Sequence, residues 1–154
     1  MYLETTMFNY YYDEDRLGHF ATVKIFENIG KGLNYGYTSD FVALELKQAP
    51  EPKQNNMIDL IYKYNIIVLN ESQKIDDLAN LYIKEGVIPK KYRLDALHIA
   101  SATVHDLDCL LTFNFKHMIK KKTKESVAYI NLHEGYKNIY ICTPMEVLDD
   151  ENQE

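Results

Sequence analysis

The stretch RLDALHIASATVHDLDCLLTFNFKH, residues 93–117, decides the fold class of this chain. Its first half places Asp95 near the start of an otherwise apolar run and predicts a helix over residues 91–107. Its second half predicts a buried strand over residues 109–113, and Asn114 follows that strand directly. Because a helix leading into a buried strand is a unit of parallel α/β folds, the stretch predicts polar groups at one edge of a parallel sheet.

The same alternation continues in both directions along the chain. Apolar runs predict further strands at residues 2–5, 35–38, 66–69 and 139–142. Helical spacing predicts helices at residues 6–12, 16–30, 39–48, 54–64, 72–85 and 115–133. Parallel strands need long crossover connections, which helices of this length supply. We therefore predict an α/β fold, a three-layer α/β/α sandwich with a central, mainly parallel sheet, in which residues 66–69 form a fully buried strand.

Length and cysteine content set the cellular context. The 154 residues suffice for one domain, predicted over residues 1–146, with an acidic and flexible tail over residues 147–154. Cys109 and Cys142 each sit in an apolar run, which predicts buried free thiols and a reducing compartment. No apolar run reaches the roughly 18 residues that a membrane span needs. These features predict a cytoplasmic protein with no membrane partner.

Charge is distributed unevenly along the chain. The formal net charge is −6, which argues against a protein that coats nucleic acid through bulk electrostatics. Positive charge is nevertheless clustered in two neighbouring segments, at Lys90, Lys91 and Arg93 and at Lys116, Lys120, Lys121, Lys122 and Lys124. Two interpretations stay open, a solvated helix face and a local patch that guides phosphate groups.

Four polar side chains are predicted to converge on one rim of the sheet. Glu4 and Asn114 follow strands, and Asp95 begins a helix that precedes a strand. Glu45 lies in the helix that leaves the same edge. Each has an ordinary alternative. Asp95 would be favoured by the helix dipole, Glu4 suits a short edge strand, and Asn114 is a common turn residue. Glu45 lies beside an apolar stripe, so its carboxylate needs a cation or a donor as partner.

Other catalytic arrangements receive less support. His98 lies one turn after Asp95, so an Asp–His pair for acid–base chemistry is one interpretation, and a core histidine with a backbone hydrogen bond is the other. His117 lies among lysines and reads as a phosphate contact or as a plain surface residue. The chain has no Gly-x-Ser-x-Gly motif and no glycine-rich phosphate loop after a strand, which argues against a serine hydrolase and a nucleotide-binding fold.

Several segments together resemble a known family. The matching segments are YLETT at residues 2–6, TSDFVALEL at residues 38–46, DALHIASA at residues 95–102, LLTFNFKH at residues 110–117 and ICTP at residues 141–144. In order and content the chain resembles PIN-domain proteins of the VapC type, the toxin ribonucleases of bacterial and archaeal toxin–antitoxin pairs. The resemblance spans nearly the whole chain, and the segments around Asp95 and Asn114 are its most specific parts.

The resemblance implies a metal-dependent endoribonuclease that hydrolyses phosphodiester bonds in RNA with Mg²⁺ or Mn²⁺. Carried over by position, Glu4, Glu45, Asp95 and Asn114 would be the catalytic and metal-binding residues. Thr6 falls where the family has a small hydroxyl residue near the metal. Hard divalent cations prefer oxygen ligands, and a bound metal lowers the pKa of a water nucleophile. The resemblance also implies a cognate antitoxin protein and a homodimer as partners.

Two positions depart from the family pattern. Glu4 stands where the family usually has Asp, and Asn114 stands where a fourth acid is common. These departures motivate a second hypothesis, a catalytically weakened PIN-like module that binds RNA or a protein. A third hypothesis is a metal-dependent phosphoesterase for DNA or a small molecule, because the same carboxylate pocket suits such enzymes. The chain has no added domain to thread DNA, which makes the third hypothesis the weakest.

Overall fold

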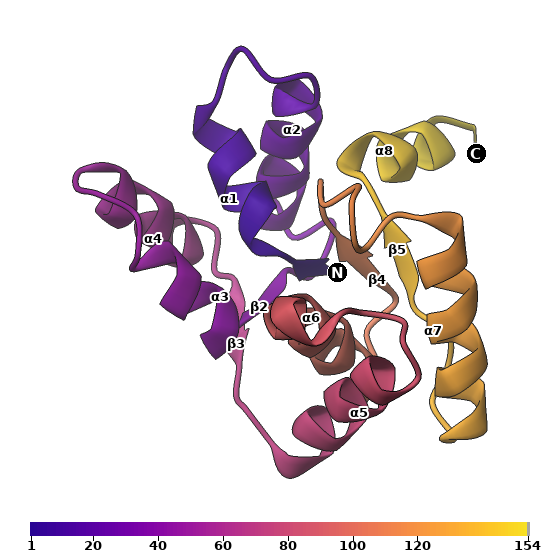
Figure 1. Ribbon diagram of the computed structural model, residues 1–154. Helices are drawn as coiled ribbons and strands as arrows, with labels where there is room; N and C mark the ends of the chain where they lie inside the picture. The colour runs from indigo at the N-terminus through magenta and orange to yellow at the C-terminus, as the bar shows by residue number, and fades with distance from the viewer. Residues whose placement is uncertain (154) are drawn as a thin grey trace.

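The computed structural model describes residues 1–153 and shows helices alternating with strands (Figure 1). The strands within these residues are β1 (Tyr2–Leu3), β2 (Tyr37–Ser39), β3 (Ile67–Leu69), β4 (Cys109–Leu111) and β5 (Tyr140–Cys142). The α-helices within these residues are α1 (Thr5–Tyr12), α2 (His19–Gly30), α3 (Asp40–Leu46), α4 (Lys53–Lys63), α5 (Gln73–Lys84), α6 (Arg93–Val104), α7 (Lys121–His133) and α8 (Pro144–Gln153). A short 3₁₀ helix, η1 (Lys90–Tyr92), leads into α6.

All the strands lie in one parallel sheet with the order β3-β2-β1-β4-β5. Tyr2 of β1 pairs with Tyr37 of β2 on one side and with Leu110 of β4 on the other. Helices α1, α2 and α8 lie on one side of the sheet, and α5, α6 and α7 lie on the other (Figure 1). The predicted fold class is therefore confirmed as a three-layer α/β/α sandwich, with a sheet that is parallel throughout.

The strand order places a topological switch point between β1 and β4. From β1 the chain proceeds to β2 and β3 on one side, and then returns across the sheet to β4 and β5. The connections on the two sides of this point lie on opposite faces, because parallel crossovers have a fixed right hand. In open α/β sheets the carboxyl ends of the strands at such a switch point form the usual ligand-binding crevice. Glu4 and Thr112 directly follow the two strands that border it.

Serine side chains cap the N-termini of two helices. The Oγ atom of Ser39 accepts a hydrogen bond from the backbone N–H of Val42 at 3.3 Å, and α3 begins at the next residue, Asp40. Ser72 accepts in the same way from Ile75 at 3.4 Å and caps α5. Each bond satisfies one of the backbone donors that a helix leaves free in its first turn. The cap on α3 also ties the end of β2 to the helix that carries Glu45.

Strand β3 is more exposed than predicted. The run of apolar residues from Ile66 to Leu69 predicts a fully buried strand, but Ile67 is 48% exposed and Val68 is 37% exposed. The prediction was wrong because β3 is the last strand on its side of the sheet. An apolar run indicates a strand, but its place in the sheet depends on the connections made by the rest of the chain.

The end of the chain also differs from the prediction. The boundary predicted at residue 146 falls inside α8, and residues 147–153 continue that helix. Val147 and Leu148 are partly buried and pack against the core, which explains why the helix continues despite its acidic residues. Glu154 lies outside the described residues.

Two further predictions need adjustment. The helix predicted over residues 115–133 begins only at Lys121, because residues 115–120 form turns after Asn114. Within the described residues both cysteines are free, as predicted, but each is only partly buried. No helix among residues 1–153 combines the length and apolar character needed to cross a membrane.

Candidate functional site

Glu4 is held rigidly at the carboxyl end of β1. It is 4% exposed and caps the N-terminus of α1. Its Oε2 atom accepts hydrogen bonds from the Thr6 hydroxyl at 2.6 Å, the Thr6 backbone N–H at 3.1 Å and the Thr112 hydroxyl at 2.7 Å. The Thr112 bond joins the ends of β1 and β4 across the switch point. No hydrogen bond from residues 1–153 reaches Oε1, so that oxygen is the one left for a ligand.

Asp95 lies in the first turn of α6, and its charge acts on the same part of the sheet edge. Burial raises the pKa of this carboxyl, and the negative charge of Glu4 raises it further. The charge of His98, the amide of Asn114 and the charge of His117 lower the pKa, but burial and Glu4 prevail. A raised pKa marks a carboxylate that lacks enough positive charge or donors around it. The negative charge of Glu4 therefore acts on Asp95 in the same direction as burial does.

Glu45 has hydrogen-bonding partners, as expected for a carboxylate beside an apolar stripe. Its side chain, 26% exposed, extends from α3 towards α6, where Oε1 lies 2.6 Å from Nε2 of His98. The same oxygen accepts a hydrogen bond from the Thr5 hydroxyl at 2.8 Å. Burial on its own would raise the pKa of Glu45, but His98 and Thr5 outweigh it and the pKa is lowered. The protein itself thus supplies the partners that favour the ionised form of Glu45.

His98 is the centre of a buried chain of hydrogen bonds. It is 1% exposed, and its Nδ1 atom lies 2.7 Å from the Tyr2 hydroxyl. That hydroxyl lies 2.6 Å from Oγ of Ser39, the residue that caps α3. Burial would lower the pKa of His98, but the contact with Glu45 and the charges of Glu4 and Asp95 raise it. His98 is a core histidine, as one interpretation predicts, but its partners are the side chains of Glu45 and Tyr2 and not a backbone group.

Asn114 organises the turn after β4. Its side-chain Oδ1 accepts a hydrogen bond from the backbone N–H of His117 at 3.0 Å, and its own backbone N–H donates to the Thr112 hydroxyl at 3.0 Å. The side-chain oxygen is therefore engaged locally, as the turn interpretation predicts. Its amide interacts with Asp95 and lowers the pKa of that acid. In this arrangement Asn114 positions Asp95 more directly than it offers an oxygen to a ligand.

The four predicted residues form two subgroups. Glu4 directly follows β1, Asn114 lies in the turn after β4 and Asp95 lies in the first turn of α6, whereas Glu45 is turned towards His98. Among residues 1–153, no three Asp, Glu, His or Cys side chains stand close enough together to hold a metal ion. The oxygen donors and the raised pKa of Asp95 nevertheless match the chemistry of a hard divalent cation. Glu4 and Asp95 are the two carboxylates that would hold such an ion.

Sequence reasoning missed several residues that build the rim. Thr112, Thr5, Tyr2 and Ser39 all contribute hydroxyl groups to the hydrogen bonds around Glu4, Glu45 and His98. A positional signal was available for two of them, because Ser39 is the last residue of β2 and Thr112 directly follows β4. Thr6 was identified. Its hydroxyl donates to Glu4 and accepts from the backbone N–H of Phe113 at 2.8 Å, which fastens α1 to the end of β4.

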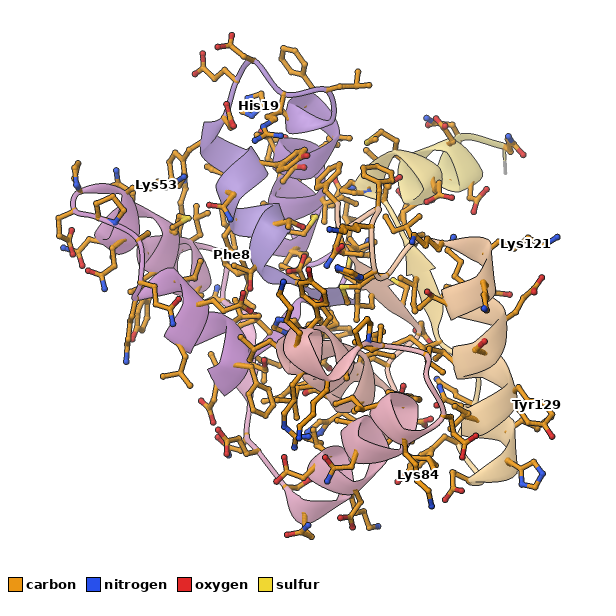
Figure 2. All side chains as sticks on the ribbon, viewed as in Figure 1. Phe8, His19, Lys53, Lys84, Lys121 and Tyr129 are labelled. Atoms are coloured by element: carbon orange, nitrogen blue, oxygen red, sulfur yellow. The ribbon has the colours of Figure 1, made fainter. Side chains whose placement is uncertain are left out.

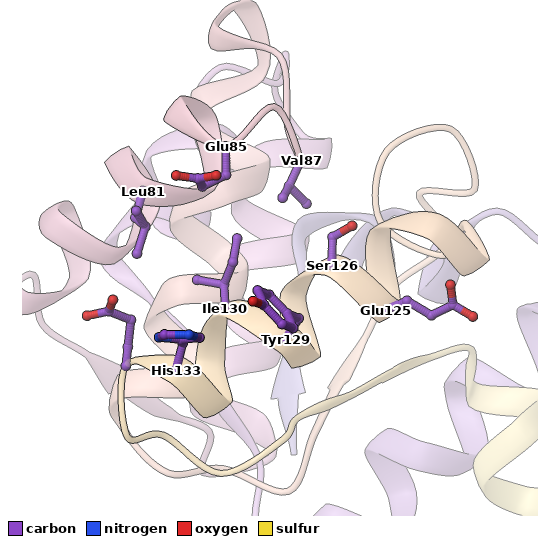
Figure 3. Close-up of a pocket in the computed structure, with 9 residues that line it drawn as sticks. Leu81, Glu85, Val87, Glu125, Ser126, Tyr129, Ile130 and His133 are labelled. Carbon is purple, nitrogen blue, oxygen red and sulfur yellow. The ribbon is translucent and has the colours of Figure 1, made fainter.

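Two cavities lie beside the rim on the α5–α7 side of the sheet. One, of about 490 Å³, lies between the end of α5 and the length of α7, with Tyr129, Ile130 and His133 along one wall (Figure 3). None of the predicted site residues lines it. The other, of about 340 Å³, is lined by His117 and by lysines of the predicted basic cluster.

No protein-family model matches this chain, and no curated protein matches its sequence.

Proposed function

We propose that this protein is a metal-dependent endoribonuclease of the PIN type, and that Asp95 is the central residue of its site. The observation that carries the proposal is the state of Asp95. Its carboxyl group is partly buried in the first turn of α6, and burial together with the negative charge of Glu4 raises its pKa. Such a pair of carboxylates costs free energy unless a cation lies between them. A divalent cation at the switch point between β1 and β4 would supply that charge.

In this proposal some residues of the rim bind the cation, and others hold those residues in position. Glu4 and Asp95 would bind the cation, which when present lowers the pKa of a water nucleophile and offsets charge on the scissile phosphate. Thr6 and Thr112 hold Glu4 by one oxygen and leave the other free. His98 fixes the direction of Glu45, and Asn114 positions Asp95 through its amide.

RNA is the proposed substrate because a basic surface adjoins the acidic rim. Asn114 is followed by His117, Lys116 and the lysines at the start of α7, so the turn after β4 joins the two surfaces. The net charge of the whole chain is −6, which favours a local contact with a defined RNA over indiscriminate binding. A cytoplasmic location follows from an RNA substrate.

Cleavage of a structured RNA pool by the purified protein tests the proposal. The reaction is run with Mg²⁺, with Mn²⁺ and with EDTA, beside Asp95→Asn and the matched surface variant Asp108→Asn. The side chain of Asp108 is 92% exposed and pairs with Lys137, so its substitution controls for the loss of one negative charge. We expect cleavage that requires the metal, persists in Asp108→Asn and falls at least about a hundredfold in Asp95→Asn.

One feature of the rim favours a second candidate function. Glu4 already accepts three hydrogen bonds and Glu45 is paired with His98, so both acids have partners without a metal. This favours a catalytically weakened PIN-like module that binds RNA or a protein. Absence of cleavage by the parent protein, together with RNA binding that Asp95→Asn leaves unchanged, would support the module and contradict the nuclease.

Together with this function we propose two protein partners, a cognate antitoxin and a second copy of the chain. Leu17 is 91% exposed and Phe20 is 86% exposed at the connection between α1 and α2. Exposed apolar side chains of this size are a common feature of protein-binding surfaces. Size-exclusion chromatography with light scattering of the parent and of Leu17→Asp would test the homodimer, which the substitution is expected to dissociate.

A further inference from the structure

The smaller of the two cavities described above has a basic lining, and we call it the lysine pocket. Its volume is about 340 Å³. Lys116, Lys120 and Lys122 line it together with His117, and Glu85 is the one carboxylate in its wall. Three ammonium groups and one carboxylate leave a net positive charge in a confined space. The whole chain has a net charge of −6, so the positive charge of the pocket is confined to this part of the surface.

Aromatic contacts hold this wall of the pocket in place. The His117 ring lies against the Tyr92 ring, with 3.9 Å between their centroids. Nζ of Lys116 lies 5.9 Å from the centroid of the Tyr92 ring, and Nζ of Lys91 lies 5.4 Å from it. Cations over an aromatic face are attracted to it, so Tyr92 attracts Lys116 and contacts the ring of His117, both of which line the pocket. The wall is thus organised before any ligand binds.

His117 supplies an independent sign of a missing ligand. Its Nε2 atom is buried and has no hydrogen-bond partner among residues 1–153. A buried polar nitrogen without a partner costs free energy that a bound anion or water would restore. The backbone N–H of the same residue donates to Oδ1 of Asn114, which places the pocket next to the rim described above.

We propose that the lysine pocket binds one phosphate group of the RNA strand, held by Lys116, Lys120, Lys122 and His117. The assignment of the phosphate to RNA rests on the proposed function, whereas the affinity for a phosphate group does not. A phosphate presents several oxygens to surrounding donors, and lysine ammonium groups bind it as point charges. Glu85 would disfavour any part of the ligand that carries further negative charge near the end of α5, which limits the pocket to a single group.

Binding of small phosphates in the presence of EDTA tests the pocket without cleavage. The probes are inorganic phosphate, adenosine 5′-monophosphate and adenosine, titrated by NMR or calorimetry. Lys120→Gln and Lys122→Gln are compared with Lys121→Gln, which removes the same charge from a residue between them. The Lys121 side chain is 89% exposed, contacts Glu125 and points away from the molecule at the start of α7 (Figure 2). His117→Phe removes Nε2 and keeps an aromatic ring against Tyr92.

We expect saturable binding of both phosphates and none of adenosine. Lys120→Gln, Lys122→Gln and His117→Phe should each weaken binding about tenfold, the loss of one charge-assisted contact, and Lys121→Gln should have less than about a twofold effect. Equal losses in all three lysine variants would indicate diffuse surface charge and overturn the pocket. So would an absence of saturable binding in a parent protein whose circular dichroism shows it folded.

The source of the phosphate is tested by competition. A trinucleotide of RNA should displace adenosine 5′-monophosphate from the parent protein and much less from Lys120→Gln. Failure of the trinucleotide to compete would overturn the RNA assignment and leave a site for free phosphates. Because the measurement needs neither metal nor turnover, phosphate binding without RNA cleavage would contradict the nuclease alone. Cleavage without phosphate binding would contradict the pocket alone.

Discussion

At the scale of single residues, His98 connects the rim to the core of the sheet. Its two ring nitrogens contact Glu45 and Tyr2, and Tyr2 continues to Ser39. Every member of this chain of hydrogen bonds has a partner, and removing one member leaves the others buried and unsatisfied. A polar network of this kind fixes the position of Glu45 relative to Asp95.

We predict that His98→Gln lowers the free energy of unfolding by about 2 kcal/mol. A glutamine side chain cannot reach both partners of the imidazole at once, so either Glu45 or the Tyr2 hydroxyl loses its hydrogen bond. Urea unfolding followed by circular dichroism measures the loss. His105→Gln, at the exposed end of α6, is the control and should change stability by less than about 0.5 kcal/mol. A similar loss in both variants would contradict the proposed role of His98.

The pairing of His98 with Glu45 predicts how the free energy of unfolding depends on pH. The pKa of His98 is raised in the folded protein, so its contribution is complete below about pH 6.5, its unfolded value, and is lost as the pH rises through the folded value. The pKa of Glu45 is lowered, so its contribution is present above about pH 4.3 and is lost as the pH falls through the folded value. The stability difference between the parent and His98→Gln should therefore be largest between these two values. A difference that stays constant from pH 4 to pH 9 would exclude the ion pair.

At the scale of elements, the connection between α1 and α2 illustrates how close packing supports the rim. Gly18 precedes α2 with φ of +104°, and a Cβ atom there would lie 2.6 Å from Cε1 of Phe113. Phe113 stacks on Tyr10 of α1, with 3.8 Å between the ring centroids, and immediately precedes Asn114. Crowding at Gly18 would therefore be transmitted to the turn that carries Asn114.

We predict that Gly18→Ala is more destabilising than Gly86→Ala. Both glycines have positive φ, but a Cβ atom at Gly86 would meet nothing within 4 Å. Gly86→Ala should cost about 1 kcal/mol for the backbone alone, and Gly18→Ala should cost at least about 1 kcal/mol more because Phe113 must move. Urea unfolding of the two variants measures the difference. Equal losses of unfolding free energy in the two variants would show that Phe113 accommodates the added Cβ atom without strain, which would contradict this prediction.

The elements also show what sequence patterns can and cannot predict. The helix that carries Asp95 and the parallel strands follow from local pattern, and both were confirmed. The exposure of β3 and the packing of α8 depend on neighbours distant in the sequence, so local pattern did not reveal them. At the rim, sequence placed Glu4, Asp95 and Asn114 near one edge. It did not reveal that Glu45 turns to His98, because that pairing depends on how α3 meets α6.

At the scale of the whole molecule, opposite charges are separated between surfaces. The acidic rim lies at the switch point of the sheet, and the lysine pocket lies next to it behind the turn at Asn114. The remaining surface carries enough acid to make the chain negative overall, at −6. Long-range attraction to RNA is therefore weak, and contacts close to the site must supply the affinity.

This charge distribution predicts a shallow dependence of RNA binding on salt. If the RNA places about three phosphates against the protein, one of them in the lysine pocket, the logarithm of the binding constant should fall with the logarithm of salt concentration with a slope of about −2. Fluorescence anisotropy of a labelled single-stranded RNA, measured in EDTA across salt concentrations, gives the slope. Lys122→Gln should reduce its magnitude by at most roughly 0.7, because the lysines of the pocket share one phosphate, and Lys121→Gln should leave it unchanged. A slope steeper than about −5 would contradict a local contact.

The central claim is that the carboxylates at the switch point form a cation site, and titration with Mn²⁺ tests it most directly. Calorimetry of the parent protein, Asp95→Asn and Asp108→Asn measures binding without any RNA. We predict one Mn²⁺ site in the parent and in Asp108→Asn, with affinity at least about tenfold weaker in Asp95→Asn. No binding by the folded parent, or equal binding by the parent and Asp95→Asn, would contradict the claim.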